Sequence, residues 1–368
     1  MKFSCDKYVL QQAAASAARA AAAKSPIPTL EGLLIEAGAS VRITGYDLKK
    51  AIYTTIDADI PEPGSVLIGA RLFCEMLRRM PDGIVTVEAE NGTVSVKCGK
   101  AAFNLVGLSA DDYPDLPTVE AENGVSLPQD LLKKMINECS FAVSTNESRP
   151  VYMGTLFEIA HNELTMVSVD GYRLALRREA VEGYGDDCSF IVPGTALSDL
   201  ERLCGDSDER VVLSVGSKHI SFTVGNTVIL SRRLEGDFLN YKKAIPESFR
   251  VTVKTTRTDL LEVVERVSLI IDSKNNAPLR LTFRKDAIDF VCTTPLGKAA
   301  DSCPCEGDGG DLEIGFNDHY LSDALKAAPA EEINVCLNTG SSPCILVPAD
   351  GSDNFVYMVL PVRLRAGQ

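Results

Sequence analysis

The sequence predicts an α+β fold in which one domain is repeated three times along the chain. A strand–turn–strand pattern near residue 45 returns near residues 171 and 295, and each third carries two amphipathic helices among short strands. The offsets, 171 − 45 = 126 and 295 − 171 = 124, are close to one third of the 368 residues. Repetition at a fixed period indicates a repeated structural unit. Three unrelated α+β domains of similar length are the alternative interpretation.

The central copy of this hairpin has the strongest pattern. The alternating run at residues 163–169 predicts a strand with one buried face. Asp170-Gly171 predicts a tight turn, because Gly tolerates positive φ and Asp can bond to its own backbone. Residues 172–176 then form the returning strand. The first copy lies at residues 42–48, with Gly45 at its turn, and the third lies at residues 290–297.

The first third begins with a strand at residues 2–4. A helix should follow from about Asp6 to Ala23, since Ala has the highest helix propensity. Further strands are expected at residues 33–36, 41–44, 54–56 and 66–69, with a loop at 61–64, a helix at 70–80, and strands at 85–88 and 94–98. Asn91-Gly92 is typical of the turn between the last two.

The other two thirds repeat this order. The second should contain a strand at 124–127, a helix from Pro128, a strand at 190–194, a helix carrying Arg202, and strands at 211–215 and 220–224. Gly194 is matched with Gly69, at an offset of 194 − 69 = 125. The last third should contain a strand at 251–254, a helix from Thr258 to about Ile270, a strand ending at 314–317, a helix at 320–327 and a strand at 356–361.

Two stretches rich in acidic residues, aromatic residues and Pro separate the repeats. They lie at residues 111–123 and 235–248, and their composition predicts extended linkers. The domains are therefore expected at residues 1–120, 124–246 and 249–368.

The net charge of −14 argues against a surface that is basic all over. It does not exclude an acidic shell around a basic inner face. Basic residues lie on or beside the predicted helices of every third: Lys7, Arg19, Lys24, Arg71, Arg78, Arg79, Lys133, Lys134, Arg202, Arg257, Arg266 and Lys326. A solvated helix face explains any one of them. If the helices share one side, the charges together predict a lining that contacts phosphates without reading bases.

Residues suited to catalysis or metal binding are scattered. His161, His219 and His319 lie at unrelated points, and Cys303-Pro304-Cys305 lacks the second pair that a zinc site would need. Asp286 with Asp289, and Asp308 with Asp311, fit solvated turns. No Gly-rich phosphate loop is present. We therefore expect no catalytic residue, metal or cofactor. A cytosolic enzyme with an unrecognised carboxylate or thiol site, and a protein-binding scaffold that does not bind DNA, remain as alternatives.

The compartment is inferred from cysteine usage and hydropathy. Eleven cysteines in a chain without an export signal predict reduced thiols and a cytoplasmic location. No apolar run approaches the roughly 20 residues of a membrane span, so no membrane association is expected.

The chain resembles the bacterial sliding clamps, the β subunits of DNA polymerase III, over essentially its whole length. The residues that carry the resemblance are 170–174, the tail at 357–364 and the threefold period. The resemblance implies three tandem DNA-clamp domains in a head-to-tail homodimer, with helices lining the inside of a ring and antiparallel sheets outside. It implies a non-catalytic protein that encircles double-stranded DNA independently of sequence and gives the replicative polymerase processivity. The clamp loader and other proteins with a clamp-binding motif are implied as further partners.

The resemblance also implies three groups of site residues. The dimer interface would use Phe103 and Leu105 against Ile270 and Ile271. DNA contact would involve Lys24, Arg71, Arg78, Arg79, Lys133, Lys134, Asn146, Val151 and Tyr152. A partner-peptide groove between the second and third domains would be formed by Tyr152, Val169, Gly171, Tyr172, Arg173, Leu174, Leu239, Lys243, Ala244, Tyr320, Met358, Leu360, Pro361, Val362 and Arg363. Deleting residues 358–364 should then abolish peptide binding without dissolving the dimer.

Overall fold

The computed structural model describes residues 1–119, 124–181, 187–272 and 277–364, and it divides into two compact units. The first unit contains Met1–Lys133 and Thr195–Arg233, and the second contains Lys134–Val181 and the chain from Leu234 onward. The middle third of the chain therefore contributes to both units. Each unit is built on one large antiparallel sheet.

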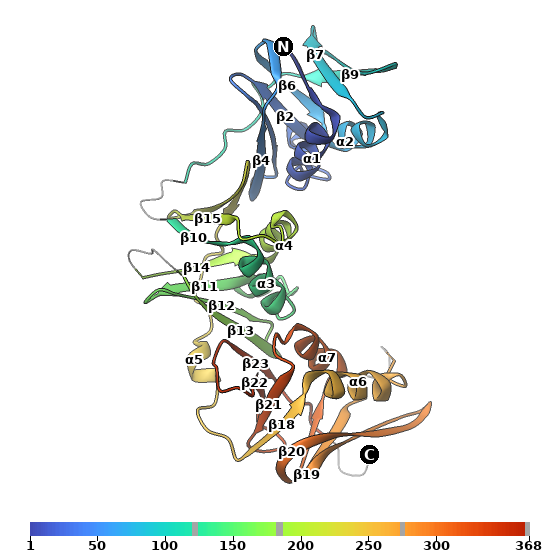
Figure 1. The fold of residues 1–368 in the computed structure, drawn as a ribbon, viewed down its shortest axis with the longest axis vertical. Helices are drawn as coiled ribbons and strands as arrows, with labels where there is room; N and C mark the ends of the chain where they lie inside the picture. The colour runs from blue at the N-terminus through green and yellow to red at the C-terminus, as the bar shows by residue number, and fades with distance from the viewer. Residues whose placement is uncertain (120–123, 182–186, 273–276, 365–368) are drawn as a thin grey trace. The chain divides into compact units, whose positions relative to one another are not determined.

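The sheet of the first unit has 13 strands in the order β10-β15-β16-β17-β4-β3-β2-β6-β9-β8-β7-β1-β5. The strands are β1 (Lys2–Asp6), β2 (Gly32–Ala37), β3 (Val41–Tyr46), β4 (Lys50–Ile56), β5 (Asp59–Glu62), β6 (Gly64–Gly69), β7 (Ile84–Glu90), β8 (Thr93–Cys98), β9 (Ala101–Leu108), β10 (Gly124–Pro128), β15 (Arg210–Val215), β16 (His219–Val224) and β17 (Thr227–Arg232). The helices are α1 (Lys7–Ala18), α2 (Ala70–Arg79) and most of α4 (Gly194–Leu203), with a 3₁₀ turn at Pro28–Glu31. Figure 1 shows α1 and α2 side by side against the sheet.

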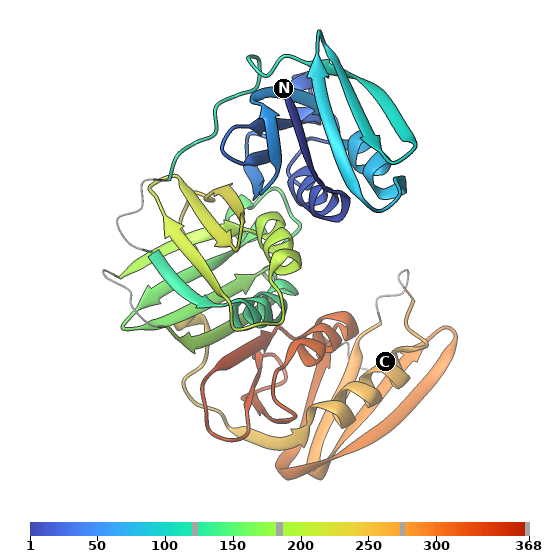
Figure 2. The same ribbon diagram turned by 45° about the horizontal axis from the view of Figure 1, so that its top comes forward.

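The sheet of the second unit has 10 strands in the order β14-β11-β12-β13-β23-β22-β21-β18-β20-β19. The strands are β11 (Gly154–Ala160), β12 (Glu163–Val169), β13 (Arg173–Ala180), β14 (Cys188–Pro193), β18 (Val251–Thr256), β19 (Leu279–Thr294), β20 (Gly297–Phe316), β21 (Glu332–Leu337), β22 (Cys344–Pro348) and β23 (Phe355–Val359). The helices are α5 (Tyr241–Ala244), α6 (Arg257–Ser268) and α7 (Asp318–Ala327), with a 3₁₀ turn at Pro150–Met153, and α3 (Gln129–Ser140) spans the boundary between the units. The long β19–β20 hairpin is orange in Figure 2, where α6 lies beside it.

Helix α1 is shorter than its sequence predicts. Asp6 caps its first turn, because the side chain accepts hydrogen bonds from the backbone N–H groups of Tyr8 (2.8 Å) and Val9 (3.3 Å). The helix ends at Ala18 rather than Ala23, although the Ala run continues. The Ala20 N–H bonds three residues back to Ala17, which tightens the last turn, and the Ala22 N–H bonds instead to the carbonyl of Leu30. Tertiary hydrogen bonds therefore override the helix propensity of the Ala run.

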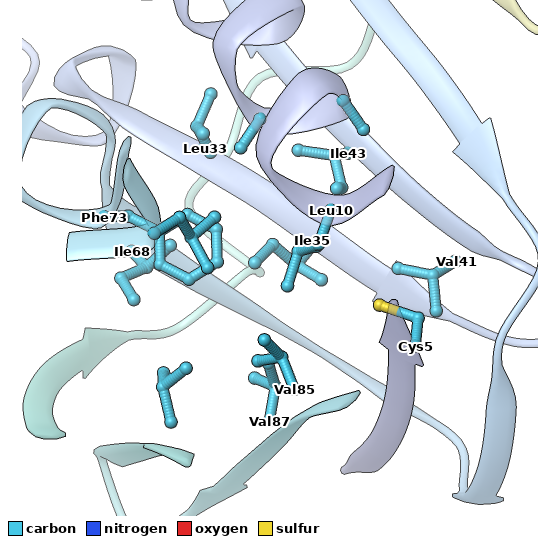
Figure 3. Close-up of a cluster of buried hydrophobic side chains, with 14 of the residues drawn as sticks. Cys5, Leu10, Leu33, Ile35, Val41, Ile43, Ile68, Phe73, Val85 and Val87 are labelled. Carbon is cyan, nitrogen blue, oxygen red and sulfur yellow. The ribbon is translucent and has the colours of Figure 1, made fainter. Parts of the chain in front are cut away.

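The core of the first unit lies between α1, α2 and the sheet. Leu10 of α1 and Phe73 of α2 are fully buried, and Figure 3 shows Leu10 beside Ile35 of β2 and Phe73 beside Ile68 of β6. The apolar face of each amphipathic helix is thereby removed from water, the main contribution to the stability of such a layer. Lys7 belongs to this buried side, because it is only 8% exposed and its ammonium lies 3.4 Å from Asp82. The prediction that Lys7 adds to a basic surface is wrong.

Three equivalent turns confirm the repeat and correct its register. Asp47 and Asp170 each accept a hydrogen bond from the backbone N–H two residues later, at 2.8 Å in both cases. The Thr294 hydroxyl accepts the corresponding bond from Leu296 at 3.1 Å. The matched positions are therefore 47, 170 and 294, at offsets of 170 − 47 = 123 and 294 − 170 = 124. Pairing Gly45 with Gly171 placed the repeat out of register by three residues.

The starts of the second helices give the same period. Gly69 pairs with Gly32, and Pro193 pairs with Gly154, immediately before α2 and α4 begin. Asn317 caps α7 in the same position. Gly69 is thus equivalent to Pro193 and not to Gly194. The third copy looks different because β19 and β20 each run through what are separate strands in the other copies, with register shifts near Lys285.

Two strand pairs join the thirds of the chain, and we call them the seams. In the first seam β17, from the second third, pairs with β4 of the first third, with Leu230 opposite Ala51. In the second seam β23, from the last third, pairs with β13 of the second third, with Met358 opposite Leu174. In both seams the last strand of one repeat adds to the fourth strand of the preceding repeat. The fold is therefore mixed α and β, with its repeats joined edge to edge.

Candidate functional site

The predicted groove residues centre on the turn that begins at Asp170, in the second unit. Oδ1 of Asp170 accepts hydrogen bonds from the backbone N–H groups of Tyr172 (2.8 Å) and Arg173 (3.0 Å). Gly171 takes a φ of +95°, which glycine adopts without steric cost. The Leu360 N–H donates to the carbonyl of Tyr172 at 2.8 Å. The turn and the start of the chain's tail are thus held together.

Some of the predicted groove residues are buried in the core rather than exposed at the surface. Val169, Leu174 and Met358 are buried in one apolar cluster, and Tyr152 and Leu360 pack at its margin. Tyr152 lies edge-on to Phe238, with ring centroids 5.6 Å apart. Removing a floor residue would disturb the core, so only the marginal and exposed residues are suited to direct contact with a partner.

Arg173 contacts two carboxylates and an aromatic ring in this region. Its Nε lies 2.9 Å from Asp170 and its Nη1 lies 2.6 Å from Asp323 of α7. The guanidinium also lies 4.7 Å from the centre of the Tyr320 ring, which stacks on Tyr172 at 5.7 Å. Burial, followed by the charge of Asp170, raises the pKa of the Tyr320 hydroxyl, which keeps it protonated and able to donate. Tyr172 is 60% exposed, so this stack presents an aromatic surface to solvent.

A hollow of about 710 Å³ opens beside the tail. Its lining consists of Glu313, Gly340, Ser341 and residues 360–364. The tail is fixed there, because the Val362 N–H donates to the carbonyl of Gly315 at 2.8 Å. Apolar walls with a few polar groups suit a short peptide with apolar anchors. The sequence reasoning missed Glu313, Gly340 and Ser341, although the Gly-Ser-Ser run after β21 was a signal for a surface loop.

The remaining groove residues lie on or beside α5. Asn240 caps this short helix, and Tyr241 anchors it in the apolar cluster and donates a hydrogen bond to Glu158. Leu239 and Lys243 are exposed and Ala244 is half-buried. Of the predicted groove residues, the lining of the hollow includes Leu360, Pro361, Val362 and Arg363 and none of the others.

The predicted DNA-contact residues are mostly exposed, and both units contribute them. Arg71, Arg78 and Arg79 share α2, and Glu75 on the same helix lies 2.9 Å from Arg78 and 3.1 Å from Arg79. Lys24 lies in the loop after α1, and Lys134 is exposed on α3. Asn146 is exposed, and Val151 and Tyr152 are half-buried in the 3₁₀ turn before β11.

Several helix cations have an acidic neighbour. Lys133 lies 2.7 Å from Asp206, Arg266 lies 2.8 Å from Asp301, and Lys326 lies 2.9 Å from Glu265. The Asp206 hydrogen bond raises the pKa of Lys133, so the amine stays charged. Such pairs reduce the net positive potential of the helix faces and favour weak phosphate contact.

The predicted interface residues lie on β9 and just after α6. Phe103 is exposed on β9, while Leu105 packs partly against the core. Ile270 and Ile271, just after α6, are half-buried. Their neighbour Leu269 is 82% exposed and Val106 of β9 is 80% exposed, and the sequence reasoning missed both.

Within the described ranges, no group of three His, Cys, Asp or Glu side chains is arranged to hold a metal ion. No helix in the part of the chain that the structure describes has the length and apolar character needed to cross a membrane.

Comparison with known proteins covers the whole chain. Three family models match in tandem: the N-terminal domain (residues 1–117), the central domain (126–240) and the C-terminal domain (242–363) of the DNA polymerase III beta subunit. The chain is 30% identical to the beta sliding clamp of Bacillus subtilis over 99% of its own length and 100% of the relative's. It is 31% identical to that of Staphylococcus aureus strain N315, covering 94% of both chains.

Solved structures agree with these matches. The sliding clamp of B. subtilis superimposes with a TM-score of 0.95 at 29% identity, covering 99% of this chain and 100% of that one. A sliding clamp from Pseudomonas aeruginosa bound to griselimycin superimposes with a TM-score of 0.93 at 27% identity, with the same coverage.

Proposed function

Because the chain belongs to the DNA polymerase III beta subunit family, the beta sliding clamps, we propose that two copies of it close head to tail into a ring around double-stranded DNA. The family is non-catalytic and acts in DNA replication. The ring would tether the replicative polymerase in the cytoplasm and receive it, the clamp loader and related partners in the groove beside Arg173. We place the three domains at residues 1–120, 124–246 and 249–368.

The observation that carries the dimer is the repetition of the seams. Each seam pairs the last strand of one repeat with the fourth strand of the preceding repeat, at β17–β4 and β23–β13. The unused last strand is β9, and the unused counterpart of β4 and β13 is the start of β20. Among the described residues, no strand pairs with the outer edge of residues 101–106 or of residues 298–303. These edges are complementary, so a second copy fits where a fourth repeat would go.

The register of this intermolecular seam follows from the other two. After each seam strand the chain pairs with the strand that precedes the second helix, at Leu108, Leu234 and Val362. Leu230 and Met358 lie four residues before Leu234 and Val362, and 108 − 4 gives Asn104. Ala51 and Leu174 correspond to Lys298, the next residue after the turn. Asn104 should therefore lie opposite Lys298 of the second copy, and Ala102 opposite Ala300.

In this arrangement, the time that the ring stays on DNA does not depend on how tightly it binds the phosphates. Phosphate contacts from α2 and the other helices would be weak, because Glu75 and similar carboxylates compete for the cations. Weak contacts exchange easily and let the ring slide, whereas escape requires opening a seam. DNA binding independent of sequence is expected, because such contacts read no base edges.

Sedimentation of the purified chain tests the dimer. The expected mass is 2 × 39.6 = 79.2 kDa. Leu269→Asp should give a folded chain of 39.6 kDa, because a charge replaces an apolar contact at the joint. Val212→Asp changes another exposed apolar residue, on β15, and should stay dimeric. A monomeric wild-type chain would contradict the ring.

Cross-linking tests the register. Ala102→Cys and Ala300→Cys in one chain should give an intersubunit product with a short bis-maleimide, while either substitution alone should give none. Cross-linking of Ala102→Cys with a cysteine at another position of β20, but not at 300, would place the edges in a different register.

A further inference from the structure

Each seam within the chain carries an ion pair at the same structural position. The turn before β4 ends at Lys50, whose ammonium contacts Asp199 of α4. The turn before β13 ends at Arg173, whose guanidinium lies 2.6 Å from Asp323 of α7. Asp199 and Asp323 are both the sixth residue of the second helix of their repeat. In both seams a cation at the end of a hairpin turn thus reaches the helix of the neighbouring repeat.

The cations of both ion pairs are shielded from water. The side chain of Asp199 is 7% exposed and that of Lys50 is 15% exposed, and Arg19 lies 3.8 Å from the same carboxylate. The side chain of Arg173 is 12% exposed, whereas that of its partner Asp323 is 43% exposed. Separating either pair would take a partner away from a buried cation, which is costly. The pairs therefore oppose separation of the strands they connect.

The third position differs. The turn after β19 ends at Gly297. Thr294 pairs with Gly297 across this turn, as Asp47 bonds to Lys50 and Asp170 bonds to Arg173 in the other two turns. Gly297 is therefore equivalent to Lys50 and Arg173. The sixth residue of α2 is Glu75, which is equivalent to Asp199 and Asp323. The carboxylate half of the pair is thus present, while the cation is absent. Glu75 instead pairs within its own helix, with Arg78 and Arg79.

We propose that the absence of a basic side chain at position 297 leaves the seam between two copies without the ion pair that this position supplies in both interior seams. This inference rests on the proposed dimer. It assigns Gly297 and Glu75 a role in setting how easily the ring opens. A joint that must open for loading keeps its strand edges and apolar contacts and loses the charge pair that fixes the interior seams.

The test adds the missing cation. Gly297 has a φ of +145°, so any side chain there strains the backbone, and Gly297→Gln is the matched control for Gly297→Lys. Subunit exchange between two fluorescently labelled populations of the full chain measures opening of the joint. Gly297→Lys should exchange about fivefold more slowly than Gly297→Gln at low salt, and the difference should shrink at high salt. With Glu75→Gln in both variants, the difference should vanish.

Equal exchange of the Lys and Gln variants would overturn the inference, as would a Lys effect that survives Glu75→Gln. A wild-type chain that is monomeric at every concentration would instead contradict the proposed dimer. Failure of the dimer and failure of this inference are therefore distinguishable. A second measurement uses an interior seam. Lys50→Gln should speed hydrogen exchange of β4 and β17 but not of β19 and β20. Unchanged exchange of β4 and β17 would show that these pairs do not secure a seam.

Discussion

The Arg173 guanidinium of β13 lies 2.6 Å from the carboxylate of Asp323 on α7, across the second seam. The same side chain lies over the Tyr320 ring and is held by Asp170 at the turn. One residue therefore fixes both the seam and the surface proposed to receive partner peptides. Changes in the seam and in peptide binding should be coupled through it.

Replacing Arg173 by Gln should weaken peptide binding. The Tyr172–Tyr320 stack would lose the cation beside it, and Asp170 would lose its partner. We expect the Kd of a peptide with Leu and Phe anchors to rise roughly tenfold, about 1.4 kcal/mol, by fluorescence anisotropy. Arg284→Gln is the control, because Arg284 forms exposed ion pairs with Asp289 and Asp311 on the β19–β20 hairpin. Equal peptide affinities of the Arg173→Gln and Arg284→Gln variants would show that Arg173 does not contribute to peptide binding.

The hollow beside the tail should be tested by substitution rather than deletion. Met358 and Val359 belong to β23, a buried strand between β13 and β22. Removing residues 358–364 would take away part of the core, so such a deletion would disturb the second seam as well as the hollow. Val362→Asp changes an exposed side chain and should raise the peptide Kd at least about tenfold, with Tm unchanged. Wild-type peptide affinity in this variant would exclude the hollow as the binding site.

Adjacent residues on α2 should differ sharply in their effect on stability. Phe73 is fully buried, and Phe73→Ala should reduce the free energy of unfolding by about 3–5 kcal/mol through loss of apolar contact and a cavity. Leu72 is 59% exposed, and Leu72→Ala should change it by less than about 0.5 kcal/mol. Urea unfolding followed by circular dichroism measures both. A similar loss in the two variants would contradict the orientation of α2.

Acid should destabilise the first unit in part through His219. Burial, together with Arg232 on the adjacent strand and Lys218, lowers the pKa of this imidazole. The folded state therefore favours the neutral form, and its contribution to stability is present above the unfolded pKa of about 6.5. This contribution is lost as pH falls through the lowered pKa. His219→Gln should show a shallower decline in unfolding free energy between pH 7 and pH 5, and an unchanged slope would argue against this cause.

Much of the repeat could be predicted from local chemistry. Asp170-Gly171 and its counterparts encode tight turns, and the threefold period follows from them. The register was wrong because Gly45 resembles Gly171 by identity, whereas the equivalent residue is Leu48, which also takes a positive φ of +71°. The glycine at position 45 serves another purpose, since a Cβ there would lie 2.0 Å from the carbonyl oxygen of Ala17.

The seams could not be predicted from local patterns. Strands β9 and β17 were not predicted, because their side-chain burial depends on a strand from another repeat or another copy. In the sequence, Leu269 belongs to the same apolar run as Ile270 and Ile271. Only its exposure in the structure distinguishes it from these two residues. The role of Lys50 and Asp199, 149 residues apart, is visible only once the repeats are superimposed.

Retention on DNA of defined topology tests the central claim most directly. The wild-type chain, placed on a nicked circular plasmid by a clamp loader, should remain bound through gel filtration in moderate salt. Cutting the circle once with a restriction enzyme should release it as the ring slides off the ends. Loss at equal rates from circular and linear DNA would contradict encirclement.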